Sequence, residues 1–467
     1  FLFFISSPFT FLVAFVEIWQ MMRFANILVL LKMMLCAGCA SIFFDRVFPK
    51  LRPVFVIILS VSYAFCGYTM LFYQNMVWLD MMYLFPLFLL SLRRLAKTGS
   101  LVPYAFSLAA MIAVNFYLGY MLVLFLILAA GIWILFFSPR ATRGQRTVQL
   151  AAGTLGAALL SAVIWIPALL QYLNSARGGN LFQSLASGSF LSPLDTIGML
   201  LLCTSIMIPA FLFQSLRCAR GEMADSKEAY TLVLFVLMLI PVIVEPINKI
   251  WHTGSYQAFP GRYGYILVLL GLCLAAQVLQ RPVDPPCRRS SVPWTAGLFI
   301  LLGAVIFAAF SLWERYPKTL TVYTRTLWGN DQSLQIFLIF FLLTAGCCGL
   351  GLFLYRHRML SRRLLAICLC VLTATEALFY GTCFFASKSD ETFIDDNAFY
   401  RVKNNRKNYD VNLTGAIGYH TLNHYTSLTG EHYMHGIRKM GYSAYWMEVS
   451  SVGGTLISDA MLNHKYT

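Results

Sequence analysis

Charged residues are scarce in this 467-residue chain, because Asp, Glu, Lys and Arg together make up only 12% of it. Hydrophobic residues make up 59%, and the mean hydropathy is +0.68. A water-soluble globular protein carries far more charge on its surface, so the composition excludes that class. The sequence therefore predicts an all-α polytopic membrane protein.

Acidic residues are scarcer still, with 20 Asp and Glu against 35 Lys and Arg, which gives a net charge of +15. A basic balance of this size can indicate a nucleic-acid partner. Here, however, the Lys and Arg residues fall in short loops between apolar runs rather than on one face or tail. That distribution is the positive-inside pattern of membrane proteins. We therefore expect a lipid bilayer and no nucleic acid as the partner.

Metal-binding and disulfide patterns are also missing. The 12 cysteines lie mostly within apolar segments and form neither a disulfide framework nor a zinc motif. Four histidines, His420, His424, His432 and His435, have helical spacing, but the residues between them do not favour a helix and no Cys or acid cluster is near. We assign no metal ligands, although a divalent metal cofactor stays possible.

Apolar runs long enough to cross a bilayer follow one another along the chain, since one span needs ~20 residues. The stretch 101–137 is too long for one crossing and predicts a hairpin that turns near Asn115. We place about twelve spans, near residues 24–44, 53–71, 80–93, 101–116, 118–137, 147–172, 196–214, 230–247, 263–280, 293–313, 334–354 and 363–385.

Loop charges orient these spans. Basic loops alternate with less basic ones, so the basic loops should be cytoplasmic and everything after Ala386 should lie outside. From Ser387 the apolar runs stop, and strand-like mixtures with Gly turns predict a soluble α/β or β-rich segment. We therefore divide the chain into a membrane domain, 1–386, and an extracytoplasmic domain, 387–467. The basic loops are 45–52, 93–97, 140–146, 217–227, 281–289 and 356–363.

A short polar stretch, Pro246–Tyr265, lies between two of these apolar runs and carries Lys249, His252, Tyr256 and Arg262. A loop rich in Gly, Pro and aromatic residues at the mouth of a helix bundle is a place where a polar substrate group can be held. The alternative is that these side chains only anchor helix ends at the lipid headgroups. Both interpretations stay open.

Three acidic residues lie within or beside the apolar runs. Asp80 follows Trp78 at an outer helix start, where it could bind the acceptor or a metal, or only cap the helix. Glu245 lies near the outer end of a span, and Glu376 lies inside the last one. A buried carboxyl group in a membrane requires a polar partner or a cavity. For Glu376 we favour a carboxyl group that joins helices, whereas for Glu245 a structural and a functional role stay open.

Several short motifs, in this order and spacing, resemble the bacterial YfhO family of membrane proteins. The specificity comes from the order, because each motif alone is short. The resemblance covers essentially the whole chain. The motifs are Asn75–Asp80 (NMVWLD), Leu84–Leu87 (LFPL), Asn115–Met121 (NFYLGYM), His252–Ser255 (HTGS) and Pro260–Tyr263 (PGRY).

The resemblance implies a GT-C-like glycosyltransferase in the bacterial cytoplasmic membrane. Such an enzyme takes a sugar from a polyprenyl-phosphate carrier and attaches it, outside, to an envelope polymer acceptor such as a teichoic acid. The chemistry requires cations for the phosphate leaving group and a carboxylate that deprotonates the acceptor hydroxyl. We expect Asp80 and Glu245 to be the catalytic acids, and the substrate-binding residues to be Lys249, His252, Tyr256, Arg262, Trp78, Asn115 and Tyr120.

Two other functions compete with this one. A transporter or flippase for a lipid-linked sugar would need the same outward cavity and cations, but we see none of the internal repeats that secondary transporters often have. A non-catalytic assembly factor would use the outer domain only to bind glycans. The opening helix and first outer loop, which commonly carry the principal acid of GT-C enzymes, are not found before Phe1. We therefore expect this chain to make no product by itself.

Overall fold

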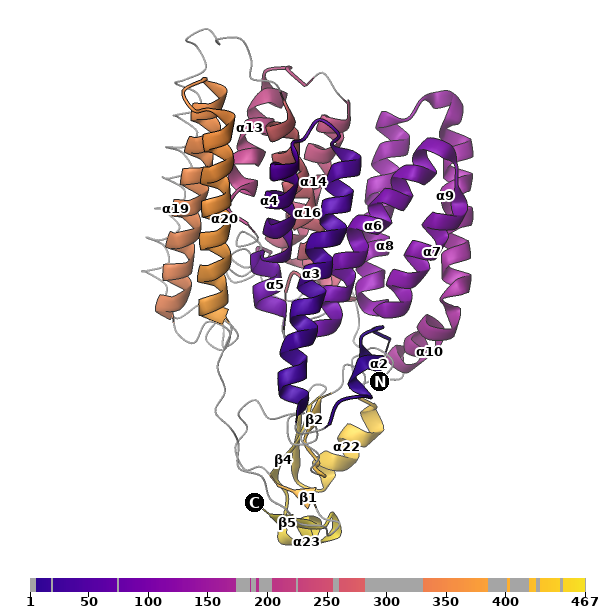
Figure 1. The fold of residues 1–467 in the computed structure, drawn as a ribbon. Coiled ribbons are helices and arrows are strands. Elements are labelled where there is room, and N and C mark those ends of the chain that lie inside the picture. Colours follow the sequence, from indigo (N-terminus) through magenta and orange to yellow (C-terminus); the bar gives the residue numbers. More distant parts are fainter. Residues whose placement is uncertain are drawn as a thin grey trace.

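The computed structural model is a bundle of long helices, and the strands among its described residues lie near the C-terminus (Figure 1). Predictions that concern Tyr256 or the span near 293–313 fall outside the part that it describes. The described residues are 6–17, 20–73, 75–173, 185, 190–192, 204–223, 226–254, 260–281, 331–384, 401–403, 420–425, 429–445 and 448–466.

The long helices coincide with the apolar runs, because a backbone surrounded by lipid must satisfy its polar groups internally. The polar stretch Pro246–Tyr265, expected to be a loop, begins instead within a short helix, Glu245–Trp251. The prediction of a hairpin turn at Asn115 is confirmed, since one helix ends at Val114 and the next begins at Phe116. The helices are α2 (Thr10–Val13), α3 (Met21–Val47), α4 (Pro53–Ala64), α5 (Gly67–Phe72), α6 (Met76–Thr98), α7 (Leu101–Val114), α8 (Phe116–Ile132), η2 (Trp133–Phe137), η3 (Arg140–Thr142), α9 (Arg143–Leu160), α10 (Ala162–Leu173), α13 (Met207–Ala219), α14 (Ser226–Ile243), α15 (Glu245–Trp251), α16 (Gly264–Gln280), α19 (Asp331–Arg356) and α20 (Arg362–Phe384).

Within the described residues, 7 helices are long and apolar enough to cross a membrane, or up to 8 if a bent pair counts as one span. The bent pair is Arg140–Leu160 with Ala162–Leu173, at an angle of 77°. Leu101–Val114 and Gly264–Gln280 are apolar but shorter. The chain is therefore a polytopic membrane protein, and the described part does not reach the twelve spans that the sequence suggested.

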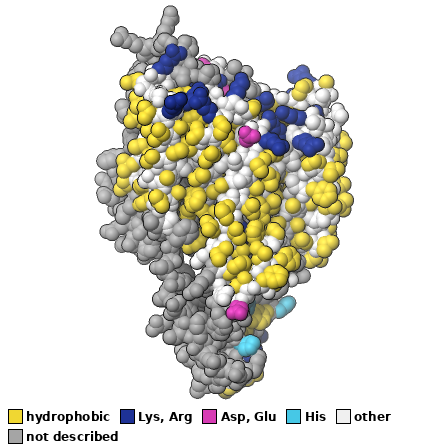
Figure 2. Space-filling view, viewed as in Figure 1, with side chains coloured by type: hydrophobic (Ala, Val, Ile, Leu, Met, Phe, Trp, Pro, Cys, Tyr) yellow, Lys and Arg dark blue, Asp and Glu magenta, His cyan; other side chains and the backbone are white. Residues whose placement is uncertain are grey.

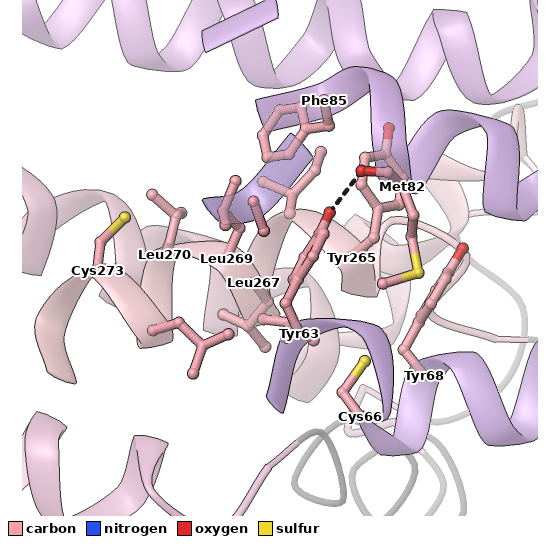
Figure 3. Packing of buried hydrophobic residues seen from close by; sticks show 14 of the residues in the cluster. Tyr63, Cys66, Tyr68, Met82, Phe85, Tyr265, Leu267, Leu269, Leu270 and Cys273 are labelled. Atoms are coloured by element: carbon pink, nitrogen blue, oxygen red, sulfur yellow. Dashed lines mark hydrogen bonds between the residues drawn. The ribbon is translucent and has the colours of Figure 1, made fainter. Parts of the chain in front are cut away.

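The core of the bundle is centred on α16, which is buried from Gly264 to Leu279 and packs against α4, α13 and α14. Figure 3 shows Tyr63 of α4 pointing toward α6, where its hydroxyl donates to the carbonyl oxygen of Met82 at 2.9 Å. Tyr265 of α16 lies beside the same cluster, and its ring packs edge-on against Phe85. The aromatic residues thus join α4, α6 and α16 into one core.

Lys and Arg side chains gather at one end of the bundle, which we call the basic end, and the middle of the visible surface is apolar (Figure 2). The strands near the C-terminus lie beyond the other end, which we call the opposite end (Figure 1). The separation is what the loop charges predict for the two sides of a membrane.

A buried ionic cluster joins three helices at the basic end. Glu228 of α14 accepts hydrogen bonds from Arg217 of α13 at 3.0 Å and from Arg281, which follows α16, at 3.1 and 3.0 Å. Beside it, Gln214 of α13 donates to Gln277 of α16 at 2.9 Å. Arg217, Gln214, Glu228 and Gln277 are all buried. The charges are thus paired where they leave water, as buried charges must be.

The strands near the C-terminus form two small sheets. β1 (Arg401–Val402) pairs in parallel with β5 (His464–Tyr466), and β4 (Glu448–Gly453) lies between β2 (His424–Tyr425) and β3 (Tyr442–Tyr445) in antiparallel pairing. Helices α22 (Glu431–Lys439) and α23 (Leu456–Met461) complete this part, whose small core includes Met434, Ile437 and Val449. His432 and His435 lie on α22, so our expectation that this stretch is not helical is wrong there.

An ion pair ties Lys403, which follows β1, to α23 and gives this part a predicted response to acid. Lys403 Nζ lies 2.7 Å from a carboxylate oxygen of Asp459, and the hydroxyl of Tyr442 donates to the other oxygen at 2.7 Å. The hydrogen bond from Lys403 holds the pKa of Asp459 below its usual value. The ionised carboxylate therefore stabilises the fold above about pH 4, and this contribution is lost as the pH falls through the lowered pKa.

Asp459→Asn should accordingly destabilise this part by about 0.2–1 kcal/mol at neutral pH, since the pair is partly exposed. Cleavage by pepsin at several pH values from about 5 to about 3 measures the effect. The ratio of variant to wild-type cleavage rates should fall toward one as the pH falls. A ratio that does not change with pH would exclude the proposed role of the Asp459 charge.

Candidate functional site

Arg262 lies at the opposite end, held between aromatic rings. Its guanidinium carbon is 5.3 Å from the ring centroid of Trp78 and 5.1 Å from that of Tyr117. The side chain is only 7% exposed, and the backbone carbonyl accepts a hydrogen bond from Tyr68 at 2.8 Å. Gly261 precedes it with a φ of +74°, a conformation that favours glycine. Cation–π contacts on two rings thus fix the guanidinium in position. We call the rings of Trp78 and Tyr117 the aromatic cradle.

A hydrogen-bonded network lies next to the cradle, on α15. Glu245 Oε2 accepts from Ser192 at 3.1 Å and lies 3.5 Å from the amide nitrogen of Asn248. Asn248 Oδ1 accepts from Tyr263, the neighbour of the cradle arginine, at 3.2 Å. The fully buried His252 places its Nδ1 2.9 Å from the backbone carbonyl of Asn248. Glu245 and His252 are therefore brought together through Asn248, which the sequence analysis did not single out.

Two tyrosines of α8 attach to the end of α15. Tyr117, whose ring belongs to the cradle, donates from its hydroxyl to the carbonyl of His252 at 3.3 Å. Tyr120, predicted to bind substrate, donates to the carbonyl of Ile250 at 2.9 Å and is 36% exposed. The Asn-Phe-Tyr-Leu-Gly-Tyr motif therefore holds α15 in place, whatever else Tyr120 contacts.

Lys249 is half-buried on α15, and its backbone carbonyl accepts the N–H of Gly254 at 2.7 Å. Its role as a second phosphate cation stays a prediction. Tyr256 lies outside the described residues.

Asp80 forms a buried ion pair with Lys32 of α3. Lys32 Nζ lies 2.9 Å from Asp80 Oδ2 and also donates to Ser7 Oγ at 3.1 Å and to the carbonyl of Met76 at 3.0 Å. The ammonium group lies 5.2 Å from the ring centroid of Phe9. Lys32 is 2% exposed and Asp80 is 0% exposed. Removal of either partner would leave an uncompensated charge inside the bundle.

The alternative that Asp80 caps a helix is wrong. α6 begins at Met76, so Asp80 lies beyond its first turn, and the N-cap residue is Asn75. Sequence reasoning also missed Lys32, because it lies inside an apolar run that we treated only as a span. A single ionisable residue within such a run is itself a signal of function or pairing.

Asn115 occupies the turn between α7 and α8 and is fully buried. Its Oδ1 caps α8 by accepting from the N–H of Leu118 at 3.0 Å, whereas its Nδ2 has no hydrogen-bond partner among the described residues. Ser6 donates to the neighbouring carbonyl of Val114 at 3.1 Å, and Ser7 bonds to Lys32. The segment Ser6–Ser7 therefore connects the Asn115 turn to the Lys32–Asp80 pair.

The aromatic cradle and the Lys32–Asp80 pair lie on different sides of the first turns of α6. Trp78 and Asp80 are two positions apart on α6, so their side chains do not face each other. Trp78 contacts Arg262, whereas Asp80 contacts Lys32 of α3. The structure thus places the cradle with the Glu245 network, and Asp80 separately with α3.

Glu376 has the structural role that we favoured. Its carboxylate accepts from the backbone N–H of Ser205 at 3.0 Å, from the hydroxyl of Ser205 at 2.6 Å and from Tyr380 at 2.9 Å. These bonds join α20 to the residues just before α13. The interpretation of Glu376 as a carboxyl group that joins helices is therefore confirmed.

No metal site is assembled in the part of the chain that the structure describes. Among these residues, no group of three or more His, Cys, Asp or Glu side chains is arranged to hold a metal ion.

Comparison with known proteins identifies the family. The family model described as bacterial membrane protein YfhO matches residues 2–467. No curated protein and no solved structure matches the chain. The matched range includes the cradle, the α15 network and the Lys32–Asp80 pair, so all of these are features of a family member. The chain belongs to the YfhO family of bacterial membrane proteins.

Proposed function

We propose that this protein transfers a sugar from a polyprenyl-phosphate carrier to a cell-envelope polymer, such as a teichoic acid, on the outer face of the bacterial cytoplasmic membrane. The observation that carries the proposal is the aromatic cradle, which holds the Arg262 guanidinium at the opposite end of the bundle, 5.3 and 5.1 Å from two ring centroids. A lipid-linked phosphate lies just outside the hydrocarbon, where helix ends also lie, and a fixed guanidinium suits its oxygens.

Two carboxyl groups near the same end are available to take the proton of the acceptor hydroxyl. Glu245 lies in the network beside the cradle, and Asp80 lies on the other side of α6 with Lys32 as its partner. Deprotonation by a positioned carboxylate contributes ~10²–10⁴-fold to transfer reactions of this kind. The arrangement supports a GT-C-like layout, with the membrane domain 1–386 carrying the chemistry and residues 387–467 facing outward.

Transfer is tested with membranes from a strain that lacks the gene and from the same strain with the full-length gene restored, because residues 1–467 alone are expected to make no product. Both receive a radiolabelled polyprenyl-phosphate sugar, and label in the envelope polymer is measured. Label that depends on the restored gene is expected. Equal incorporation in both membranes would exclude the transferase.

A flippase is the second candidate, because a buried Lys–Asp pair inside membrane spans also occurs in transporters. Proteoliposomes distinguish the two. A transferase should leave a lipid-linked sugar on its original leaflet when no acceptor is present. Movement of the sugar between leaflets without an acceptor would favour the flippase.

Orientation gives a separate prediction. Thr98, at the basic end, and Glu431, on α22, are both exposed. Single cysteines at these positions, in a cysteine-free background, should differ in intact cells, so that an impermeant thiol reagent labels position 431 and not position 98. Both should react after the cells are lysed. Labelling of position 98 in intact cells would reverse the proposed orientation.

A further inference from the structure

We infer that Lys32 is a positioning residue for the proposed sugar transfer: it holds Asp80 as a carboxylate whose second oxygen accepts the acceptor proton, and it does not bind the carrier phosphate. The inference rests on the proposed function and assigns separate tasks to the two buried cations at the opposite end, Lys32 and Arg262. It also assigns the base to Asp80 rather than to Glu245.

The first step of the argument is that Lys32 has no donor left for a ligand. An ammonium group has three hydrogens, and Nζ has three acceptors at hydrogen-bond distance, which are Ser7 Oγ at 3.1 Å, Met76 O at 3.0 Å and Asp80 Oδ2 at 2.9 Å. A phosphate could bind Lys32 only by displacing one of them.

The second step concerns the surroundings of Asp80. An unpaired carboxyl group that is fully buried favours its neutral form, which is a poor base. The titratable groups that face Asp80 among the described residues are Lys32 and Cys36 of α3 and Tyr83 of α6 itself, with the hydroxyl of Ser7 beside them. Lys32 is the cation among them. Its charge therefore favours the carboxylate, and the hydroxyl groups of Ser7 and Tyr83 act in the same direction.

The third step is that one oxygen of Asp80 stays available. Oδ2 is bonded to Lys32, whereas Oδ1 makes no hydrogen bond among the described residues. A buried acceptor without a donor costs stability, and such groups are rare unless they have a role. A sugar hydroxyl would supply the missing donor. In the reaction that proton moves to Oδ1, the hydroxyl oxygen bonds to the anomeric carbon, and the carrier phosphate leaves with the electron pair of the broken bond.

Infrared difference spectroscopy tests the charge without any substrate. The spectrum of wild type minus Asp80→Asn at neutral pH should contain carboxylate bands for Asp80. The corresponding spectrum of Lys32→Gln minus Lys32→Gln/Asp80→Asn should contain the band of a protonated carboxyl group instead. A protonated band in the spectrum of wild type minus Asp80→Asn would overturn the inference. That spectrum does not require Lys32→Gln to fold.

Kinetics then separate positioning from structure. Lys32→Gln should lower kcat by about 10²-fold, leave KM for the polyprenyl-phosphate sugar unchanged, and move the acidic limb of the pH–rate profile to higher pH. Lys32→Arg, which keeps the charge, should keep the wild-type limb. A folded Lys32→Gln protein with the wild-type limb would overturn the inference while transfer itself stands. Absence of transfer by wild type would instead overturn the proposed function, and the inference with it.

Discussion

Arg262→Ala is expected to lower sugar transfer by ~10²–10³-fold, the loss that follows removal of one group stabilising developing negative charge. Arg262→Lys should fall between this variant and the wild type. Lysine keeps the charge, but it cannot present a planar fork of donors to a phosphate or stack flat on the rings of Trp78 and Tyr117. Incorporation of labelled sugar into envelope polymer, at equal protein abundance, measures both variants.

The chain provides a matched control. Arg362 is also held by an aromatic ring, with its guanidinium carbon 5.8 Å from the ring centroid of Tyr355, but it lies at the basic end. Arg362→Ala removes the same kind of contact and should leave transfer at the wild-type level. If Arg262→Ala also transfers normally at wild-type abundance, only the anchoring role of Arg262 remains.

Asp80→Asn is expected to lower transfer by ~10²–10⁴-fold, because an amide cannot take the proton of the acceptor. The single variant also leaves Lys32 buried without a counter-charge, which costs about 3–5 kcal/mol. Its abundance should therefore fall. Turnover per folded molecule, measured after purification in detergent, separates the two effects.

A second substitution removes the loss of stability that the unpaired charge of Lys32 causes. Lys32→Gln/Asp80→Asn has no buried charge, so its abundance should recover while transfer does not. Glu245→Gln is the companion variant, since an amide can replace the carboxylate as the acceptor for Ser192. Wild-type turnover by the double variant together with loss in Glu245→Gln would assign the base to Glu245.

Composition and motif order were sufficient for the class and the family of this protein. They were also sufficient to identify Arg262, Trp78 and Asn115 as separate candidates, because such residues between or beside apolar runs can be recognised in the sequence. Contacts between segments that are far apart in the sequence cannot be recognised in this way. The approach of Tyr117 to Arg262, and of Lys32 to Asp80, depends on how α3, α6, α8 and the start of α16 pack.

Helix ends were predicted less well than helix existence. Apolar periodicity does not mark the first residue of a helix, so α6 was expected to start at Asp80 although it begins at Met76. Span counts have a similar limit. α16 is buried almost throughout, and a helix surrounded by other helices need not match the thickness of the lipid.

The Glu228 cluster also has a consequence for the motions that the protein can make. A carboxylate that accepts from two guanidinium groups ties α13, α14 and the end of α16 together at the basic end. Loss of Glu228 would leave the buried Arg217 without a counter-charge, so these helices should move as one rigid body there, with bending confined to the opposite end. A bundle fastened in this way can admit a substrate from one side only. Alternating access would require α13 and α14 to separate at this cluster. A disulfide between cysteines at positions 217 and 228 would replace the ion pair and keep the two helices together. If sugar transfer stays intact with this crosslink, the helices do not separate during the reaction.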